Sequence, residues 1–191
     1  MIGNIVAAAI GAGAGGAATS YESIATTTVG SGGQTTISFT SIPSTYTHLQ
    51  LRVMARSTFA DTDSIFIVRV NSDTGNNYPN HFVQGNGSGV GAYGYTSSTY
   101  NYAFLLTLPG ASASANFFGG GVIDILDYKD TNKNKTIRAF GGHDRNGAGD
   151  IRLNSSVWLN TSAITSITIT DYRTGNFAEY SSFALYGIKA A

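Results

Sequence analysis

Short segments in which apolar and polar residues alternate run through most of this chain, and they constrain its fold more than any other feature. Residues 47–56 show the pattern clearly, because every second position from Leu49 to Ala55 is apolar. A period of two places such residues on one face of a β-strand. Comparable segments, rich in Thr, Ile, Val and Tyr, occupy residues 21–29, 35–40, 64–71, 78–84, 103–108, 121–128, 135–140, 150–159, 165–170 and 182–189.

Pro79 interrupts the segment at 78–84, so these eleven segments predict an all-β fold of about nine or ten strands joined by short turns rich in Gly, Asn and Asp. We expect an antiparallel β-sandwich, of jelly-roll type. Residues 21–29 and 35–40 flank a Gly-rich turn at 30–33 and are expected to pair as a hairpin. Residues 85–120 are the least regular part, with one clear strand at 103–108, and a stretch of that kind is usually functional or mobile.

The first nineteen residues differ from the rest, because they carry no charge and almost no bulky side chain. They lack the Lys or Arg that begins a secretory signal, and their glycines weaken a membrane helix. Gly11, Gly13 and Gly16 match G-x-G-x-x-G, but no strand precedes them and no βαβ unit follows. We therefore divide the chain into an N-terminal docking arm, residues 1–19, and a β-sandwich domain, residues 20–191.

Two interpretations of the arm remain open. The first ten residues can form a short helix with its bulky apolar residues on one side, and that side would dock on a partner. A disordered tail of small residues fits the composition equally well. The docking residues of the first interpretation are Ile2, Ile5, Val6 and Ile10.

Composition narrows the classes of partner. Lys plus Arg equals Asp plus Glu at 11 each, and charged residues make up only 12% of the chain. A nucleic-acid-binding surface needs a basic stripe, so that class is disfavoured. A chain without net charge has little protection against self-association, which suits a protein that works in an assembly. The chain has no cysteine, which excludes disulfides and thiolate metal sites.

The histidines and the acidic residues give weak signals for chemistry. His48, His81 and His143 form no pair with metal-ligand spacing. Residues 144–150 place oxygen ligands near the spacing of a calcium loop but lack its terminal Glu, so a hairpin turn explains them as well as a calcium site does. We expect no cofactor and no metal.

Catalytic patterns are also missing. Asp124 and Asp127 are expected on one strand, where their odd separation points them to opposite faces, and a glycosidase needs both carboxylates in one cleft. No G-x-S-x-G motif occurs. We therefore expect that the protein is not an enzyme and name no catalytic residue, with a hydrolase as a minor alternative.

Four tyrosines stand in the irregular region among Gly, Ser and Asn. Aromatic rings in such surroundings are common in surfaces that recognise sugars or proteins. Their i, i+2 spacing would place each pair on one strand face. Ordinary packing at a subunit contact is the alternative explanation. The candidate glycan or receptor contacts are Tyr93, Tyr95, Tyr100 and Tyr102.

Several stretches resemble small virion proteins of tailed bacteriophages, of the minor tail, tail fibre and virion structural group. The stretches are SYESIATTTVGSGG, TTISFTSIPSTYTHLQLRVMAR, NSDTGNNY, GGVIDILDYKDTNKNKTIRAFGG, DRNGAGDIRLNSSVWLNTSAITSITI and NFAEYSSFALYGIK, which together reach from Ser20 to Lys189. The resemblance implies a place on the virion, as a fibre, a tail tip or a head or neck decoration, with other virion proteins as partners. By analogy with phage fibres and spikes it also implies a homo-oligomer, with a trimer expected.

Two hypotheses about function follow. The first is a structural virion component that docks through its arm and displays the sandwich outward. The alternative is a carbohydrate- or receptor-binding module that contacts the host surface through the tyrosines, and both can hold together. No membrane span and no nucleic-acid partner are expected.

Overall fold

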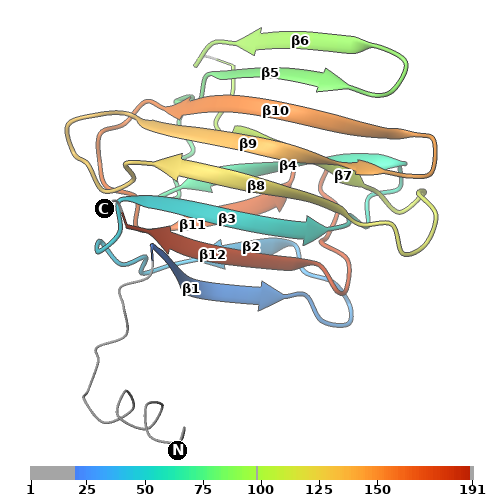
Figure 1. Cartoon of the computed structure of the whole chain (residues 1–191), viewed down its shortest axis with the longest axis horizontal. Helices are drawn as coiled ribbons and strands as arrows, with labels where there is room; N and C mark the ends of the chain where they lie inside the picture. Colours follow the sequence, from blue (N-terminus) through green and yellow to red (C-terminus); the bar gives the residue numbers. More distant parts are fainter. Residues whose placement is uncertain (1–19, 98, 190–191) are drawn as a thin grey trace, which may run out of the picture.

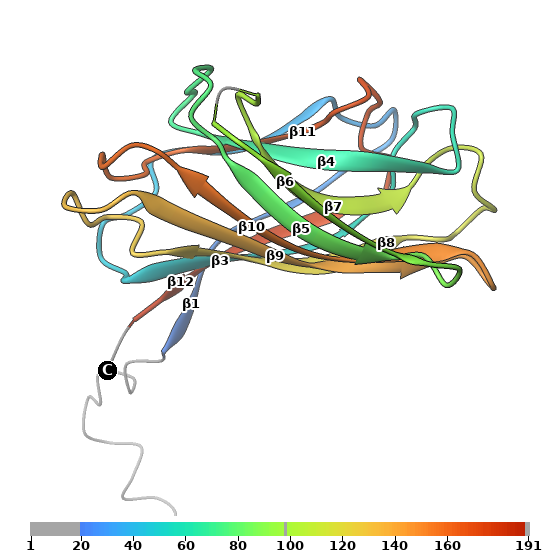
Figure 2. The same cartoon turned by 90° about the horizontal axis from the view of Figure 1, so that it is seen from above.

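The protein, described here from a computed structural model for residues 20–97 and 99–189, is a β-sandwich of two antiparallel sheets. The large sheet has eight strands in the order β1 (Tyr21–Thr28), β12 (Ser182–Ile188), β3 (His48–Ala55), β8 (Gly119–Leu126), β9 (Lys135–Asp144), β10 (Gly149–Trp158), β5 (Asn80–Gly85) and β6 (Val90–Tyr95). The small sheet has four, in the order β2 (Thr36–Phe39), β11 (Ile167–Asp171), β4 (Asp63–Val70) and β7 (Ala103–Pro109). Figure 1 looks onto the outer face of the large sheet, and Figure 2 shows the two layers from above. The predicted all-β sandwich is confirmed.

The strand pairing is nested. β1 pairs with β12, β2 with β11, β3 with β8 and β4 with β7, as in one long hairpin, and folding this hairpin over brings β12 beside β3 and β11 beside β4. A jelly roll is a double sheet built from two Greek keys, and the assignment of this sandwich to that type stays a prediction. Two further hairpins, β5–β6 and β9–β10, widen only the large sheet, which therefore extends beyond the small one.

The expected hairpin between residues 21–29 and 35–40 is wrong, because β1 and β2 belong to different sheets. The turn carries the chain from one layer to the other. Gly33 has a left-handed φ of 76°, and Gln34 exchanges backbone hydrogen bonds with Phe177. A Gly-rich turn indicates a change of direction but does not determine which partner the next strand finds.

The region predicted to be irregular holds more strands than expected. It contains β6 and the start of β8 in addition to β7. Asp124 lies on β8, but Asp127 lies beyond the last strand residue, with a left-handed φ of 49°, so the two carboxylates do not share a strand. The predicted docking residues of the arm lie outside the described residues. The part of the chain that is described contains no helix long and apolar enough to cross a membrane.

The core lies between the two sheets and follows the predicted alternation. On β3, the four apolar residues from Leu49 to Ala55 are all buried, and Phe183 and Leu185 on β12 continue the same inner face. β7 is buried along its whole length although it is an edge strand of the small sheet, because the widened large sheet lies beneath it.

Glycines of β8 and β9 let β7 approach the large sheet closely. A methyl group on Gly121 would lie 2.7 Å from two carbons of Leu106, and one on Gly141 would lie 2.8 Å from Leu106 and 2.3 Å from a backbone oxygen of Gly120. Leu106 is itself buried and has no room to withdraw. β7 therefore fills the space that larger side chains at Gly121 and Gly141 would occupy.

We expect Gly121→Ala to lower the free energy of unfolding by about 1–3 kcal/mol, since the added carbon overpacks the contact with Leu106. Gly120→Ala is the matched control, because its added carbon points outward, with its nearest neighbour at 3.4 Å. Both changes stiffen the unfolded chain alike. Denaturant unfolding of the two variants measures the difference, and equal stabilities would contradict the packing role of Gly121.

Candidate functional site: the apolar outer face of the large sheet

Two rows of residues cross the outer face of the large sheet side by side. The strand register aligns Val122, Phe140, Leu153, Val83 and Ala92 in one row, from β8 through β9, β10 and β5 to β6. The next row, two residues further along each strand, aligns Met54, Gly120, Gly142, Ile151, Gly85 and Val90. From β8 to β6 every member of both rows is apolar or glycine, whereas on β3 the first row continues with the exposed Arg52.

The large side chains of these rows form one exposed surface, which we name the apolar face. Their exposed fractions run from 37% at Val122 to 82% at Val90, with Phe140 at 55%. Contiguous apolar surface of this extent on a soluble protein marks a contact with another molecule. The members are Met54, Val83, Val90, Val122, Phe140, Ile151 and Leu153.

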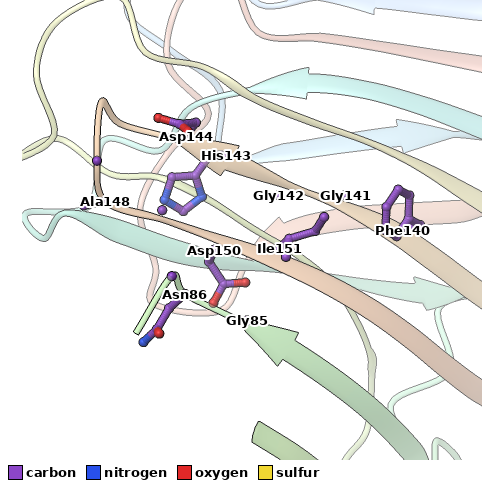
Figure 3. Close-up of a pocket in the computed structure, with 13 residues that line it drawn as sticks. Gly85, Asn86, Phe140, Gly141, Gly142, His143, Asp144, Ala148, Asp150 and Ile151 are labelled. Atoms are coloured by element: carbon purple, nitrogen blue, oxygen red, sulfur yellow. The ribbon is translucent and has the colours of Figure 1, made fainter. Parts of the chain in front are cut away.

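A groove of about 650 Å³ is sunk into the apolar face (Figure 3). Gly141 and Gly142 lie between Phe140 at one end and the β9–β10 turn at the other, while residues 85–87 line the side toward β5. Gly142 cannot be replaced without movement, because an added carbon would lie 2.0 Å from the backbone oxygen of Asp150. A second hollow of about 260 Å³ shares Phe140 and Ile151 and continues toward Val83 and Val90.

Charged residues lie at both ends of the apolar face, as measured along the direction of the strands. On one side, Arg138 of β9 lies 3.7 Å from Asp124 of β8, and Gln50 donates a hydrogen bond to the same carboxylate at 3.0 Å. On the other side, the exposed Asp144 accepts a hydrogen bond from the backbone N–H of Asn146 at 2.7 Å. The apolar rows therefore lie between a cationic and an anionic position of the same strand, β9.

Beneath the groove, the inner faces of β9 and β10 carry a buried polar layer instead of aliphatic core. His143 Nδ1 lies 3.2 Å from the carbonyl oxygen of Thr107, and Arg145 donates a hydrogen bond to Nε2 of His143 at 3.1 Å. These contacts fit a neutral imidazole with its proton on Nδ1. Burial lowers the pKa of His143, and the nearby Arg145 lowers it further, while Asp63 and Asp150 act in the opposite direction.

Asp150 and Arg152 lie in the same layer. Their closest charged atoms are 3.8 Å apart, and burial raises the pKa of Asp150 and lowers that of Arg152. The guanidinium also stacks on Phe82, 4.5 Å from the ring centre. Asp144 and Asp150, the ends of the possible calcium loop, belong to opposite faces of the sheet. The described residues hold no group of three or more His, Cys, Asp or Glu that is placed to bind a metal ion.

The predicted tyrosines lie on the opposite, inner side of the large sheet, with Tyr93 and Tyr95 on β6 and Tyr100 and Tyr102 in the segment before β7. Tyr102 is buried, and Tyr95 and Tyr100 pack with it in a small aromatic cluster, in which Tyr100 lies 4.9 Å from Phe104. Burial raises the pKa of Tyr100 and Tyr102. Tyr93 shares a face of β6 with Tyr95, as its spacing predicted, but Tyr100 and Tyr102 precede β7 and lie on no strand.

Tyr93 differs from the other three, because 44% of its surface is exposed. Its ring lies 4.9 Å from that of Phe82, which faces it across the β5–β6 pair. The aromatic cluster therefore explains three of the predicted residues through packing and leaves one ring at the surface.

The three histidines lie apart. His48 accepts a hydrogen bond from the backbone N–H of Asp127 at 2.9 Å, and His81 is exposed on β5. The residues that sequence reasoning missed are those of the apolar face. A signal was present, because Val122, Phe140, Ile151 and Leu153 occupy the strand positions that alternation assigns to solvent.

Comparison with models of known protein families, with curated proteins and with solved structures finds no match. The interpretation of the apolar face therefore depends on its own geometry and chemistry.

We expect His143 to lower the free energy of unfolding as the pH is lowered from about 7 to about 5. The lowered pKa keeps His143 neutral in the folded protein, whereas the unfolded chain takes up a proton below its ordinary pKa of 6.5. The unfolded state then binds more protons and is favoured as the pH falls. Unfolding of His143→Gln at both pH values should show a loss smaller by on the order of 1 kcal/mol. His81→Gln, on the exposed face, should keep the full loss, and equal losses in both variants would contradict the role of His143.

Proposed function

We propose that the protein is a structural component of a virion of the tailed-phage type that its sequence resembles. In this proposal, residues 1–19 attach the chain to the particle and the β-sandwich is displayed outward, as fibre, tail tip or decoration. The observation that carries the assembly role is the apolar face, a surface that a protein working alone has no reason to expose.

The charge balance supports the same role. The chain has 11 basic and 11 acidic residues, so copies or neighbours meet without net repulsion. The residues around the groove offer positions for packing and for ion pairs, but no nucleophile activated by a neighbouring base. A contact surface of this kind serves assembly better than it serves catalysis.

Deletion of residues 2–18 should leave a folded body that no longer joins particles. The measurement is the amount of protein that sediments with purified particles after complementation with the full or the truncated chain. Circular dichroism and the unfolding midpoint of the truncated protein provide the control for folding. Normal incorporation of the truncated chain would contradict docking through the arm, and absence of the full chain from particles would contradict the virion role itself.

A second function, glycan binding by the sandwich, is favoured by the position of Tyr93. Its ring is half exposed and is held by Phe82, while Arg152 donates a hydrogen bond to Gln84 beside them. A fixed aromatic ring with the side-chain amide of Gln84 nearby provides a stacking surface and a hydrogen-bonding group for a sugar. Tyr95, Tyr100 and Tyr102 would then support the ring and not contact the glycan.

A glycan array tests this candidate. We expect Tyr93→Ala to reduce binding at least about tenfold, because loss of a stacking ring removes a central contact. Tyr180→Ala is the control, since that tyrosine is 72% exposed and lies outside the aromatic cluster. If the wild-type chain binds no glycan, or if both variants bind like the wild type, the candidate fails.

A further inference from the structure

We propose that the apolar face joins two copies of this chain, packed face to face about a two-fold axis that crosses the strands at Gly141. The axis lies between the large sheets of the two copies and runs perpendicular to their strands. Each strand of one copy then lies over the same strand of the other, in the reverse direction. The contact is isologous, so each surface element must fit another element of the same chain.

The two rows of the apolar face meet this requirement in shape. Rotation about the axis places the row that contains Phe140 in one copy over the glycine-rich row that contains Gly142 in the other. Phe140 therefore lies over Gly142 of the partner subunit, where the groove is sunk, and Val122 lies over Gly120 of the partner subunit. The two rows lie two residues apart along each strand, a distance of about 6.7 Å. The rotation exchanges the rows, so a large side chain of one copy lies over a glycine of the other.

The same relation holds on the neighbouring strand β5. Val83 and Gly85 are placed symmetrically about the axis, so the valine of each copy lies over the glycine of the other. On β10, Leu153 and Ile151 meet as two large side chains. Face-to-face sheets cross at about −30°, so the fit is tightest over β9 and β10 and loosens toward β3 and β6.

The charges that bound the apolar face are self-complementary about this axis as well. Arg138 and Asp144 lie on the outer face of β9, three residues to either side of Gly141. The axis therefore brings Arg138 of each copy over Asp144 of the other and forms two symmetric ion pairs. The Arg138 side chain is 53% exposed and within reach of such a partner.

The exposed apolar area approaches what a stable dimer needs, and the charged residues at its two ends add to it. With about 160–210 Å² for a fully exposed large apolar side chain, the exposed fractions of the seven residues amount to about 700 Å². A standard interface takes about 800 Å² from each partner. A second copy fits better than an unrelated partner, because an unrelated partner would not require shape and charge to repeat symmetrically about Gly141.

Sedimentation velocity of the full chain tests the proposal directly. We expect a species with twice the 19.9 kDa mass of one chain. Phe140→Glu should weaken the dimer at least about 30-fold, since it buries a charge at the centre of the contact. Leu159→Glu is the matched control, because Leu159 is exposed to a similar degree but lies outside the apolar face, and it should leave the dimer unchanged.

A charge exchange tests the two-fold axis. Arg138→Asp and Asp144→Arg should each weaken the dimer about 3- to 10-fold, and the double variant should recover the wild-type affinity to within about twofold. Additive losses in the double variant would overturn this axis. Circular dichroism of each variant establishes that loss of the dimer is not loss of the fold.

Three outcomes would overturn the proposal: a monomer at all concentrations, a trimer as expected from the resemblance to phage fibres, or a dimer that is insensitive to Phe140→Glu. A contact with a different protein would appear as a monomer in pure solution. The proposal does not depend on the virion role. Particle incorporation tests that role, the mass in solution tests this contact, and either can fail alone.

Discussion

The close packing of β7 against the glycines of β8 and β9 is the contact on which most of this structure depends. Leu106 fills the space that Gly121 and Gly141 leave on the inner face, so the small sheet lies close to the large one. Successive residues of a strand point to opposite faces of the sheet. Gly120 and Gly142, which are next to Gly121 and Gly141 in the sequence, therefore face outward. One glycine-rich crossing thus provides both the tight core and the hollow on the apolar face.

Two hairpins, β5–β6 and β9–β10, widen the large sheet beside this glycine-rich contact. β9 and β10 cover β7, and β5 and β6 extend past the small sheet, so their inner face needs a separate cluster of aromatic residues. The tyrosines that resembled a recognition surface in the sequence are used mainly for this packing. The outer face of the same hairpins carries most of the apolar face, which no second layer of the described residues covers.

The sequence allowed the strands and the two-layer fold to be predicted, because a side-chain period of two is a local property. It did not allow strand partners to be predicted. The turn at 30–33 reads as a hairpin turn, yet it joins two sheets, and only the long-range pairing of β1 with β12 decides this. β6 escaped notice because Gly91 and Gly94 interrupt its alternation.

The sequence also did not allow the hydrogen-bond partners of two charged residues to be predicted. Arg56 follows β3 as a charged residue, yet it does not simply face solvent, because it donates hydrogen bonds to backbone carbonyls of Ala111, Ala113, Ser114 and Phe117 and so orders the loop before β8. Lys135 is fully buried and donates hydrogen bonds to the backbone carbonyls of Asp130 and Lys133 in the turn after β8 and of Thr161 after β10. A charged residue in a sequence is assigned to the surface unless its backbone partners are known, and those partners arise only from the fold.

The position of the apolar face also separates the two means of attachment that are proposed for this chain. β1 begins at the end of the large sheet opposite the β9–β10 turn, where the groove lies (Figure 1). A two-fold axis across the strands reverses their direction, so the two sandwiches of a dimer would begin at opposite ends. If both proposals hold, the two points from which the arms depart lie at opposite ends of the dimer, so the dimer presents two attachment points and the apolar face joins the copies between them.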